Sequence, residues 1–565
     1  MATGLRKGLT SYGDPGFSLF LRRAFIKAMG YSDDALDRPI VGIADTRSDY
    51  NACHGNVPQM VEAVRRGVML AGGLPMAFPT VSIHESFAHP TSMFLRNLMA
   101  MDTEEMIRAQ PMDAVVLVGG CDKTVPAQLM AAASLDIPAV SLVTGPMLVG
   151  HYKGETLGAC TDCRRFWARH RAGEIDEAEM DVLSGRLAPT PGTCMVMGTA
   201  STMACLAEAL GMALPGSATI PATHADRLRC AEQSGAAAVA AIREGGRTPA
   251  DILTPAAFRN AQIVLQAIGG STNGLVHLAA IAGRRGLRID LDGFDAIGRE
   301  APVLIDLKPT GDHYMEHFHW AGGLPRLMRE LEVLLDTDAR TVAGTTLKDS
   351  IAAAEDVPGQ TVIRRRDDPV FATGGMAVLH GNLGSAIIKF GAATPALLQH
   401  TGRAVVFENV EDMGARIDDP ALDVQADDVL VLRNTGPKGA PGMPEAGYLP
   451  IPRKLARAGV KDMVRISDAR MSGTAFGTIV LHVVPEASEG GPLALVRNGD
   501  PIRLDVAART IDVLVEPPEL ARRQAAWTPP PSHPGSDRGY LNLYLRCVLQ
   551  ADQGCDFDFM LPAQR

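Results

Sequence analysis

Between residues 39 and 147 the chain alternates short apolar runs with longer segments of helical periodicity, and this order restricts the fold more than any other feature. Strand-like runs and helix-like segments follow one another at 39–46, 55–73, 76–83, 91–110, 113–120, 125–136 and 138–147. In the first helix-like segment, Val57, Met60, Val61, Val64 and Val68 recur at the spacing of one helix face. A β-α-β-α-β-α-β order predicts an α/β fold with a parallel sheet and helices on both faces.

The second half of the chain has a different pattern, which begins after residue 366. Strand-like pieces follow one another as MAVLHG, AIIKFG, RAVVFEN, DDVLVLRN and TIVLHVV, and then as an alternating stretch at 493–515 around an Asn498-Gly499 turn signal. We therefore predict two domains, an α/β domain at 1–366 and a mainly β domain at 367–565. The Gly- and Pro-rich stretch 435–447 is either a linker or a binding loop.

Charge and apolar content exclude several classes of protein. The net charge of −10 over 565 residues argues against a general nucleic-acid binder, which needs a basic face. The N-terminal sequence MATGLRKGLTSYGD has no apolar h-region, and no run approaches the ~18 apolar residues of a membrane span. We therefore expect a cytoplasmic protein with no nucleic-acid or membrane partner. The odd number of cysteines, nine, argues against a disulfide framework and favours buried thiols or metal ligands.

Reactive side chains follow three of the strand-like runs at the point where each run ends. They are Asp49 and Cys53 after the first, His84 and Glu85 after the second, and Cys121, Asp122 and Lys123 after the third. Because ligands sit at the carboxyl ends of the strands in an open α/β sheet, we expect these groups on one rim. Cys194 precedes a long helical pattern in 189–212, and a helix N-terminus favours a thiolate.

Cys53, Cys121 and Cys194 are candidate ligands of an iron–sulfur cluster, although no compact C-x2-C-x2-C motif joins them. The alternative is that each is an ordinary buried cysteine. The nearby Glu85 and Asp122 favour the first interpretation, because carboxylates suit Mg2+ whereas thiolates suit iron. One rim with both types of ligand would form a site for two different metals.

Several other motifs have ordinary explanations on sequence grounds. Cys160-x-x-Cys163 has no second pair at zinc spacing, and the two histidines of HESFAH (84–89) are one residue too far apart for a zinc-protease helix. AIGGSTNG (267–274) either cradles an anion at a helix start or caps a helix. Taken alone, Ser472 predicts a helix cap or a turn, and Glu445 predicts a solvated carboxylate.

Longer motifs resemble the dihydroxy-acid/6-phosphogluconate dehydratase family. They are GGCDKTVPAQLMAAASLDIPAV, GTCMVMGTASTMACLAEALGMALPGSATIPA, AIGGSTNGLVHLAAIAGR, NTGPKGAPGMPE and VRISDARMSGTAFGTIVLHVVPEA, in family order from about residue 14 to beyond 550. CDKTVPA and GTASTMA are most similar to the sugar-acid dehydratases, especially those of pentonates such as arabinonate or xylonate. His54 and His84 depart from the pattern, because many relatives have Asn at the first position and the sugar-acid enzymes often have Ser at the second.

The resemblance implies a role for each candidate residue. Cys53, Cys121 and Cys194 would hold a [2Fe-2S] cluster, which is [4Fe-4S] in some relatives. Glu85, Asp122, Glu445 and a carbamylated Lys123 would bind Mg2+, and Ser472 as an alkoxide would be the catalytic base. Ser271, Thr272 and Thr474 would contact the substrate. The family fold is an N-terminal α/β domain followed by a barrel-like C-terminal domain, and relatives form homodimers or homotetramers.

The implied activity is that of a hydro-lyase, which converts 2,3-dihydroxy carboxylic acids, here aldonic acids, into 2-keto-3-deoxy acids. The cluster would activate the C3 hydroxyl, Mg2+ would hold the carboxylate, and Ser472 would remove the C2 proton. The alternative is the dihydroxy-acid dehydratase of branched-chain amino-acid synthesis, or a specificity that covers both substrates. A nucleotide-binding α/β protein is disfavoured, because no G-x-G-x-x-G follows the first strand. A scaffold protein would give no reason for Cys, Asp and Lys at one strand tip.

Overall fold

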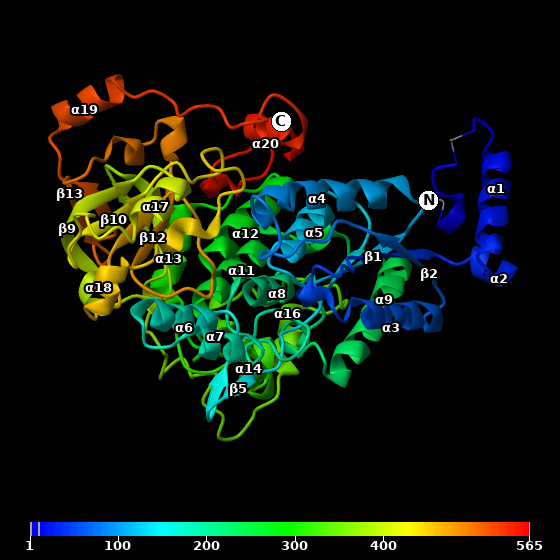
Figure 1. The fold of residues 1–565 in the computed structure, drawn as a ribbon. Coiled ribbons are helices and arrows are strands. Elements are labelled where there is room, and N and C mark those ends of the chain that lie inside the picture. The colour runs from blue at the N-terminus through cyan, green and yellow to red at the C-terminus, as the bar shows by residue number, and fades with distance from the viewer. Residues whose placement is uncertain (1–2, 10–11, 564–565) are drawn as a thin grey trace.

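A four-stranded parallel sheet forms the centre of the N-terminal half of the computed structural model, which describes residues 3–9 and 12–563 (Figure 1). Its strands lie in the order β2-β1-β3-β4, with β1 at Ile40–Asp45, β2 at Leu74–Pro79, β3 at Ala114–Gly119 and β4 at Ala139–Val143. Val116 of β3 pairs with Ile43 of β1 and with Val140 of β4. β3 is buried along its whole length, which explains why its sequence is a continuous run of small and branched apolar residues.

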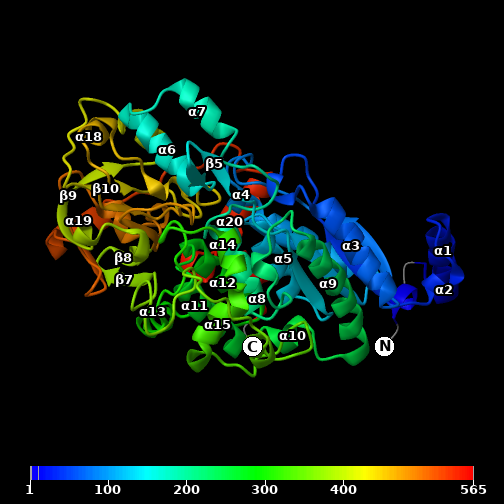
Figure 2. The same ribbon diagram turned by 90° about the horizontal axis from the view of Figure 1, so that it is seen from below.

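Helices cover both faces of this sheet, as the alternating pattern predicts (Figures 1 and 2). α3 (Val57–Leu70) and α9 (Ala225–Glu244) lie on one face, and α4 (Ser92–Ala109) and α5 (Thr124–Ala133) lie on the other. The backbones of α3 and α9 approach closely because Gly67 faces α9, where an added Cβ would lie only 1.9 Å from the carbonyl oxygen of Glu232. The expected parallel α/β sheet is therefore confirmed.

A layer of further helices connects the sheet to the second half of the chain. Its elements are β5 (Gly150–Tyr152), β6 (Glu155–Leu157), α6 (Thr161–Ala172), α7 (Glu177–Ser184), α8 (Thr199–Ala209), α10 (Pro249–Ile252), α11 (Pro255–Ala267), α12 (Thr272–Arg284), α13 (Leu291–Glu300), α14 (Met315–Trp320), α15 (Gly323–Glu330) and α16 (Leu347–Ala352). α8 and α12 pack against α5 and are buried along nearly their whole length. The two helices begin side by side, because the hydroxyls of Thr199 in α8 and of Ser271, the N-cap residue of α12, lie 2.8 Å apart.

A closed eight-stranded barrel forms the second domain, as expected for a mainly β, barrel-like unit. Around the barrel the strands are β10 (Val429–Leu432), β11 (Arg465–Ser467), β12 (Ile479–Val484), β8 (Gly384–Ile388), β7 (Ala377–Gly381), β14 (Thr510–Val513), β13 (Pro501–Asp505) and β9 (Gln399–Phe407). The Asn498-Gly499 turn leads from a 3-10 helix, η9 (Pro492–Leu495), into β13 and does not join two strands. The stretch 435–447 forms turns, and its end enters a 3-10 helix, η7 (Glu445–Tyr448).

The remaining helices lie at the periphery: α1 (Pro15–Ala28), α2 (Asp33–Leu36), α17 (Val410–Arg416), α18 (Arg453–Arg457), α19 (Pro517–Ala525) and α20 (Gly539–Cys547). After the barrel the chain returns to the first domain, where Tyr544 of α20 packs on Phe94 of α4 with ring centroids 4.9 Å apart (Figure 1). Arg284 of α12 forms a buried ion pair with Asp556. These contacts hold the end of the chain against the sheet domain. Among the described residues, no helix has the length and apolar character that crossing a bilayer requires.

Candidate active site

Loops that follow β1, β2 and β3 meet at the carboxyl edge of the sheet, as predicted. The thiols of Cys53 and Cys121 and a ring nitrogen of His84 lie within 4.8 Å of one another. Glycine is required at the tip of β3, because a Cβ on Gly120 would lie 1.6 Å from the hydroxyl oxygen of Thr144. The chain can therefore turn tightly and present Cys121 directly after the strand. Asp49, which we expected on the same rim, is exposed to solvent.

His54 holds two of these loops together, a role that its sequence context does not predict. Its Nε2 atom accepts hydrogen bonds from the backbone N–H groups of Gly120 (3.0 Å) and Cys121 (3.2 Å). Its Nδ1 atom lies 2.8 Å from the carbonyl oxygen of Thr46, which makes it the donor. Burial lowers the pKa of His54 to about 4, so the ring is neutral and keeps this tautomer. The imidazole thus sets the position of Cys121 relative to Cys53.

Cys194 lies close to a fourth thiol, that of Cys160. The two sulfur atoms are 3.3 Å apart. The helix after Cys194, α8, begins only at Thr199, so Cys194 is not at a helix N-terminus, and the expected helix-dipole effect on its thiol does not apply. Its pKa is instead raised well above the usual value, first by the hydrogen bond with Cys160 and then by burial. Its charge also acts on the pKa of Cys53, which places both thiols in one electrostatic environment.

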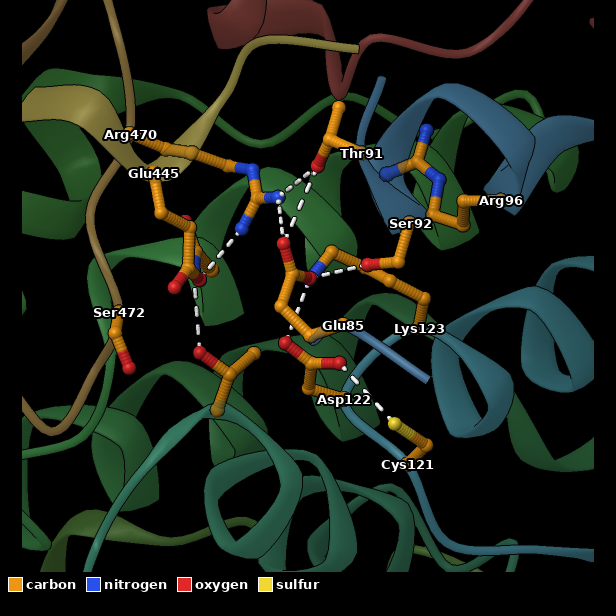
Figure 3. Close-up of polar contacts among 12 residues, drawn as sticks. Glu85, Thr91, Ser92, Arg96, Cys121, Asp122, Lys123, Glu445, Arg470 and Ser472 are labelled. Carbon is orange, nitrogen blue, oxygen red and sulfur yellow. Dashed lines mark hydrogen bonds and ion pairs between the residues drawn. The ribbon is translucent and has the colours of Figure 1, made fainter. Parts of the chain in front are cut away.

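Three carboxylates form a second group beside Cys121 (Figure 3). Oxygen atoms of Glu85, Asp122 and Glu445 lie within 4.8 Å of one another. Glu85 and Asp122 come from the sheet loops, whereas Glu445 comes from the barrel domain at the start of η7. The fully buried Nζ atom of Lys123 lies 2.7 Å from Asp122 Oδ2 and 3.0 Å from Glu85 Oε2. The two domains therefore complete this group together.

Arg470 contacts two of the three carboxylates, although no sequence pattern predicts it as a site residue. It follows β11 and donates to Glu445 Oε1 at 2.6 Å, to Glu85 Oε1 at 2.9 Å and to Thr91 Oγ1 at 2.7 Å. Its side chain is 2% exposed. One buried guanidinium thus links a carboxylate of each domain (Figure 3).

The carboxylates differ in protonation. Burial acts to raise the pKa of Glu85, but Arg470 and Lys123 outweigh it and hold that pKa well below its usual range. Burial and the charge of Glu85 raise the pKa of Glu445 to about 7. Burial and Arg470 act to lower the pKa of Lys123, yet Asp122 and the other carboxylates outweigh them and raise it. Glu85 is therefore ionised at neutral pH, while Glu445 needs a nearby cation to be fully ionised.

Ser472 lies in a loop of the barrel domain that faces the carboxylates (Figure 3). Its hydroxyl oxygen is 2.8 Å from Thr474 Oγ1 and accepts a 3.4 Å hydrogen bond from the Thr474 backbone N–H. The carbonyl of Gly473, in the same peptide group as that N–H, accepts from Lys389 Nζ at 3.4 Å. Ser472 caps no helix but begins a turn, in which its carbonyl oxygen accepts a 3.0 Å hydrogen bond from the Ala475 backbone N–H. Of the two structures that Ser472 predicts in isolation, the turn is confirmed.

Ser271 and Thr272 lie behind the Ser472 loop. The Ser271 hydroxyl caps α12 by accepting from the Asn273 backbone N–H at 3.2 Å, and it lies 2.8 Å from Thr199 Oγ1. Thr272 Oγ1 is 3.2 Å from His482 Nε2. Both side chains are fully buried. A Cβ on Gly473 would approach Ser271 Cβ to 2.5 Å, so Ser271 and Gly473 fix how closely the barrel loop approaches α12.

A cavity of about 890 Å3 opens beside the two ligand groups, between α6 and α18. Cys160, Cys163, Arg164, Tyr448 and Phe476 are among its lining residues. The guanidinium of Arg164 stacks over the Tyr448 ring at 4.8 Å and lies 4.0 Å from Glu445 Oε2. The cavity is large enough for a small organic acid. No local sequence pattern predicts this cavity, because its walls come from both domains.

The fold and the site together define a two-domain enzyme. A cluster of thiols and a cluster of carboxylates lie next to each other in it, beside one cavity. A family model for the dihydroxy-acid/6-phosphogluconate dehydratase N-terminal domain matches residues 38–350, and its C-terminal counterpart matches residues 361–555. The chain belongs to this dehydratase family and is a hydro-lyase.

Named relatives agree with this assignment over nearly the whole chain. The chain is 48% identical to an L-arabonate dehydratase of Azospirillum brasilense, over 96% of this chain and 94% of the relative. It is 45% identical to an L-arabinonate dehydratase of Rhizobium leguminosarum bv. trifolii, over 97% of this chain and 95% of the relative. It is 40% identical to a dihydroxy-acid dehydratase of Moorella thermoacetica, over 94% of this chain and 97% of the relative. These identities fit the sugar-acid branch of the family.

Proposed function

We propose that this protein is an iron–sulfur, Mg2+-dependent dehydratase of aldonic acids that forms 2-keto-3-deoxy acids and water. One observation carries the proposal. The adjacent residues Cys121 and Asp122 belong to two different ligand groups, one with two thiols and the His84 ring nitrogen and one with three carboxylates. Soft thiolates suit iron and hard carboxylates suit Mg2+, so the two donor sets fit the two groups.

Cys53, Cys121 and Cys194 would hold a [2Fe-2S] cluster, and Glu85, Asp122 and Glu445 would hold Mg2+. When bound, these groups would supply Lewis acids for the C3 hydroxyl and for the carboxylate with the C2 hydroxyl. Hydrogen bonds with neighbouring thiols and then burial raise the pKa of Cys53 and Cys194, so both thiols would release their protons only when a metal binds them.

Lys123 would join the Mg2+ ligands as a carbamate. A cation on Glu85 and Asp122 would cancel the negative field that raises the pKa of Lys123, and burial would then favour the neutral amine. That amine can bond to the carbon of CO2 and release one proton, which leaves an anionic oxygen ligand. Carbon-13 NMR of the enzyme in 13C-labelled bicarbonate tests this step, since a carbamate signal should be absent from Lys123→Arg.

Ser472 would take the C2 proton of the substrate on its Oγ atom. The Thr474 hydroxyl and backbone N–H both face that oxygen, and hydrogen bonds to the charged form of a group lower its pKa. Arg164 lines the adjoining cavity and Thr474 lies beside Ser472, so we expect both to contact the substrate. Ser271 and Thr272 would act on the substrate through the loops that they support, since their hydroxyls already have buried partners.

The substrate class rests on the relatives. The higher identity to enzymes named for arabinonate favours a sugar acid over 2,3-dihydroxyisovalerate. The test is to purify the protein without oxygen, record its visible spectrum and compare initial rates on L-arabinonate, D-xylonate and 2,3-dihydroxyisovalerate. Thiolate-to-iron bands and a higher rate on a pentonate are expected. A protein that stays colourless after reconstitution with iron and sulfide would refute the cluster, and a preference for 2,3-dihydroxyisovalerate would select the branched-chain alternative.

A homodimer or homotetramer remains our prediction for the assembly. The exposed aromatic side chains of Phe17, Phe20 and Phe25 on α1 support it, because a surface helix of a monomer rarely presents three such rings to solvent. Light scattering of the purified protein measures the mass directly.

A further inference from the structure

Cys160 is the N-cap residue of α6, and the fold holds its thiol against that of Cys194. Its sulfur lies 3.3 Å from Cys194 Sγ. The start of α6 is fixed by Thr161, whose hydroxyl donates to the Thr474 carbonyl at 3.0 Å, and by Asp162, whose carboxylate accepts from the Gly158 backbone N–H at 2.8 Å. Cys160 is therefore anchored both to the loop of the catalytic serine and to the loop that precedes α6.

The four sulfur atoms form two neighbouring pairs. Cys53 and Cys121 form one pair, and Cys160 and Cys194 form the other. Two thiolates on one tetrahedral metal, with bonds of about 2.3 Å, are roughly 3.8 Å apart. The 3.3 Å separation of the second pair is close to this value, so both sulfurs can reach one iron with a small adjustment.

We propose that Cys160 is a fourth thiolate ligand of the iron–sulfur cluster in the substrate-free enzyme, on the same iron as Cys194. This inference rests on the proposed function, because it presupposes the cluster. Four cysteines complete the ligand set of a [2Fe-2S] cluster, whereas three leave one position open. Cys160 also lines the cavity through which a substrate would arrive, so its sulfur would shield a bound cluster from that cavity. It closes that side against oxygen until a substrate enters.

Cys163 provides a matched control within the same motif. It lies three residues further along α6, lines the same cavity and contacts Cys160. Its side chain also packs with Leu157 and Phe166 in a small apolar cluster. Serine at either position removes one sulfur from α6, but only the change at 160 removes a sulfur that the described structure places against Cys194.

The experiment compares wild type, Cys160→Ser and Cys163→Ser after anaerobic reconstitution. Iron and sulfide content, visible absorption, Mössbauer spectra and the rate of bleaching in air are measured without substrate. We expect Cys160→Ser to retain its iron, to show shifted thiolate-to-iron bands and a second type of iron site, and to bleach roughly tenfold faster. Cys163→Ser should match wild type. Identical spectra and bleaching rates for Cys160→Ser and wild type would overturn the proposal, as would equal changes in both variants, which would indicate altered packing of α6.

A second measurement keeps this inference separate from the proposed function. If wild type takes up no cluster, the dehydratase proposal loses its iron–sulfur component, but the sulfur pair can still be tested with Cd2+ on the metal-free protein. Cadmium-113 NMR should then show a thiolate-bound site that is absent from both Cys160→Ser and Cys194→Ser and present in Cys163→Ser. A Cd2+ signal that survives Cys160→Ser unchanged would refute the assignment of Cys160 as a ligand.

Discussion

The thiol of Cys121 lies 3.4 Å from the Oδ1 atom of its neighbour Asp122, whose other oxygen contacts Lys123 at 2.7 Å. Adjacent residues thus face two different ligand groups, with sulfur on one side and oxygen on the other. The tip of β3 therefore fixes the separation between the two groups. This relationship is the reason for placing a thiol, a carboxylate and an amine directly after one strand.

Cys121→Ser should remove visible colour and dehydratase activity together. A Lewis acid contributes several kcal/mol to such a reaction, so activity should fall by roughly two orders of magnitude or more. Visible absorption and initial rates measure both effects. Cys547→Ser, at a partly buried thiol in α20, is the control and should behave as wild type. An active but colourless Cys121→Ser protein would contradict the proposed role of the thiols.

Asp122→Asn should impair the carboxylate site while leaving the thiol site intact. We expect the visible spectrum to persist, because the sulfur ligands remain, while the Mg2+ concentration for half-maximal activity rises roughly 10-fold to 100-fold. Mg2+ titration of activity and of the spectrum tests this. Asp49→Asn makes the same change on an exposed carboxylate of the same rim and should have no effect. Loss of colour in Asp122→Asn would mean that the two groups are not independent.

Arg470→Met should destabilise the metal-free protein by about 3–5 kcal/mol, because it leaves Glu85 and Glu445 buried without their shared partner. Urea denaturation, followed by circular dichroism, gives this difference. Arg365→Met removes an exposed pair with Asp367 and should leave the stability essentially unchanged. If saturating Mg2+ restores most of the loss in Arg470→Met, the carboxylates are the groups left unpaired; equal losses with and without Mg2+ would argue against this explanation.

Lys389→Met should remove a pH dependence of stability. Burial lowers the pKa of Lys389 to about 7 from the ordinary 10.5, so between these values the unfolded chain binds more protons than the folded one. Wild-type stability therefore gains a contribution that rises with pH across this window, by up to about 5 kcal/mol. The unfolding free energy of wild type, relative to that of Lys389→Met, should therefore be higher at pH 9 than at pH 7. Parallel pH profiles would show that Lys389 stays charged in the fold.

His54→Ala should weaken retention of the cluster, because Gly120 and Cys121 lose the acceptor for their backbone N–H groups. Iron lost to a chelator over time measures retention, and we expect roughly 10-fold faster loss. His54→Asn retains a side-chain acceptor and should fall between wild type and alanine. If alanine and wild type lose iron at the same rate, the histidine has no role in placing Cys121.

Local periodicity was sufficient for the sheet and for most of the barrel. Each strand-like run between 39 and 147 overlaps a strand of the sheet, although β2 begins and ends earlier than the run 76–83. The reactive residues after three of the runs meet as expected, except for the exposed Asp49. The errors are also local. β11 has only three residues, too few to show alternation, and the apolar residues before Asn498 form the 3-10 helix η9 instead of a strand. HESFAH is not helical, in agreement with the rejection of a zinc-protease motif.

The tertiary structure decided which distant residues share a site. Cys160 was dismissed on sequence grounds because its spacing matched no zinc motif, yet its sulfur lies beside that of Cys194. Arg470 gave no signal at all, although it links Glu85 of one domain to Glu445 of the other. Backbone geometry sets the period of a strand or helix, and that period is visible in neighbouring residues. Contacts such as those of Arg470 depend on how a barrel packs against a sheet, and only the folded chain contains that information.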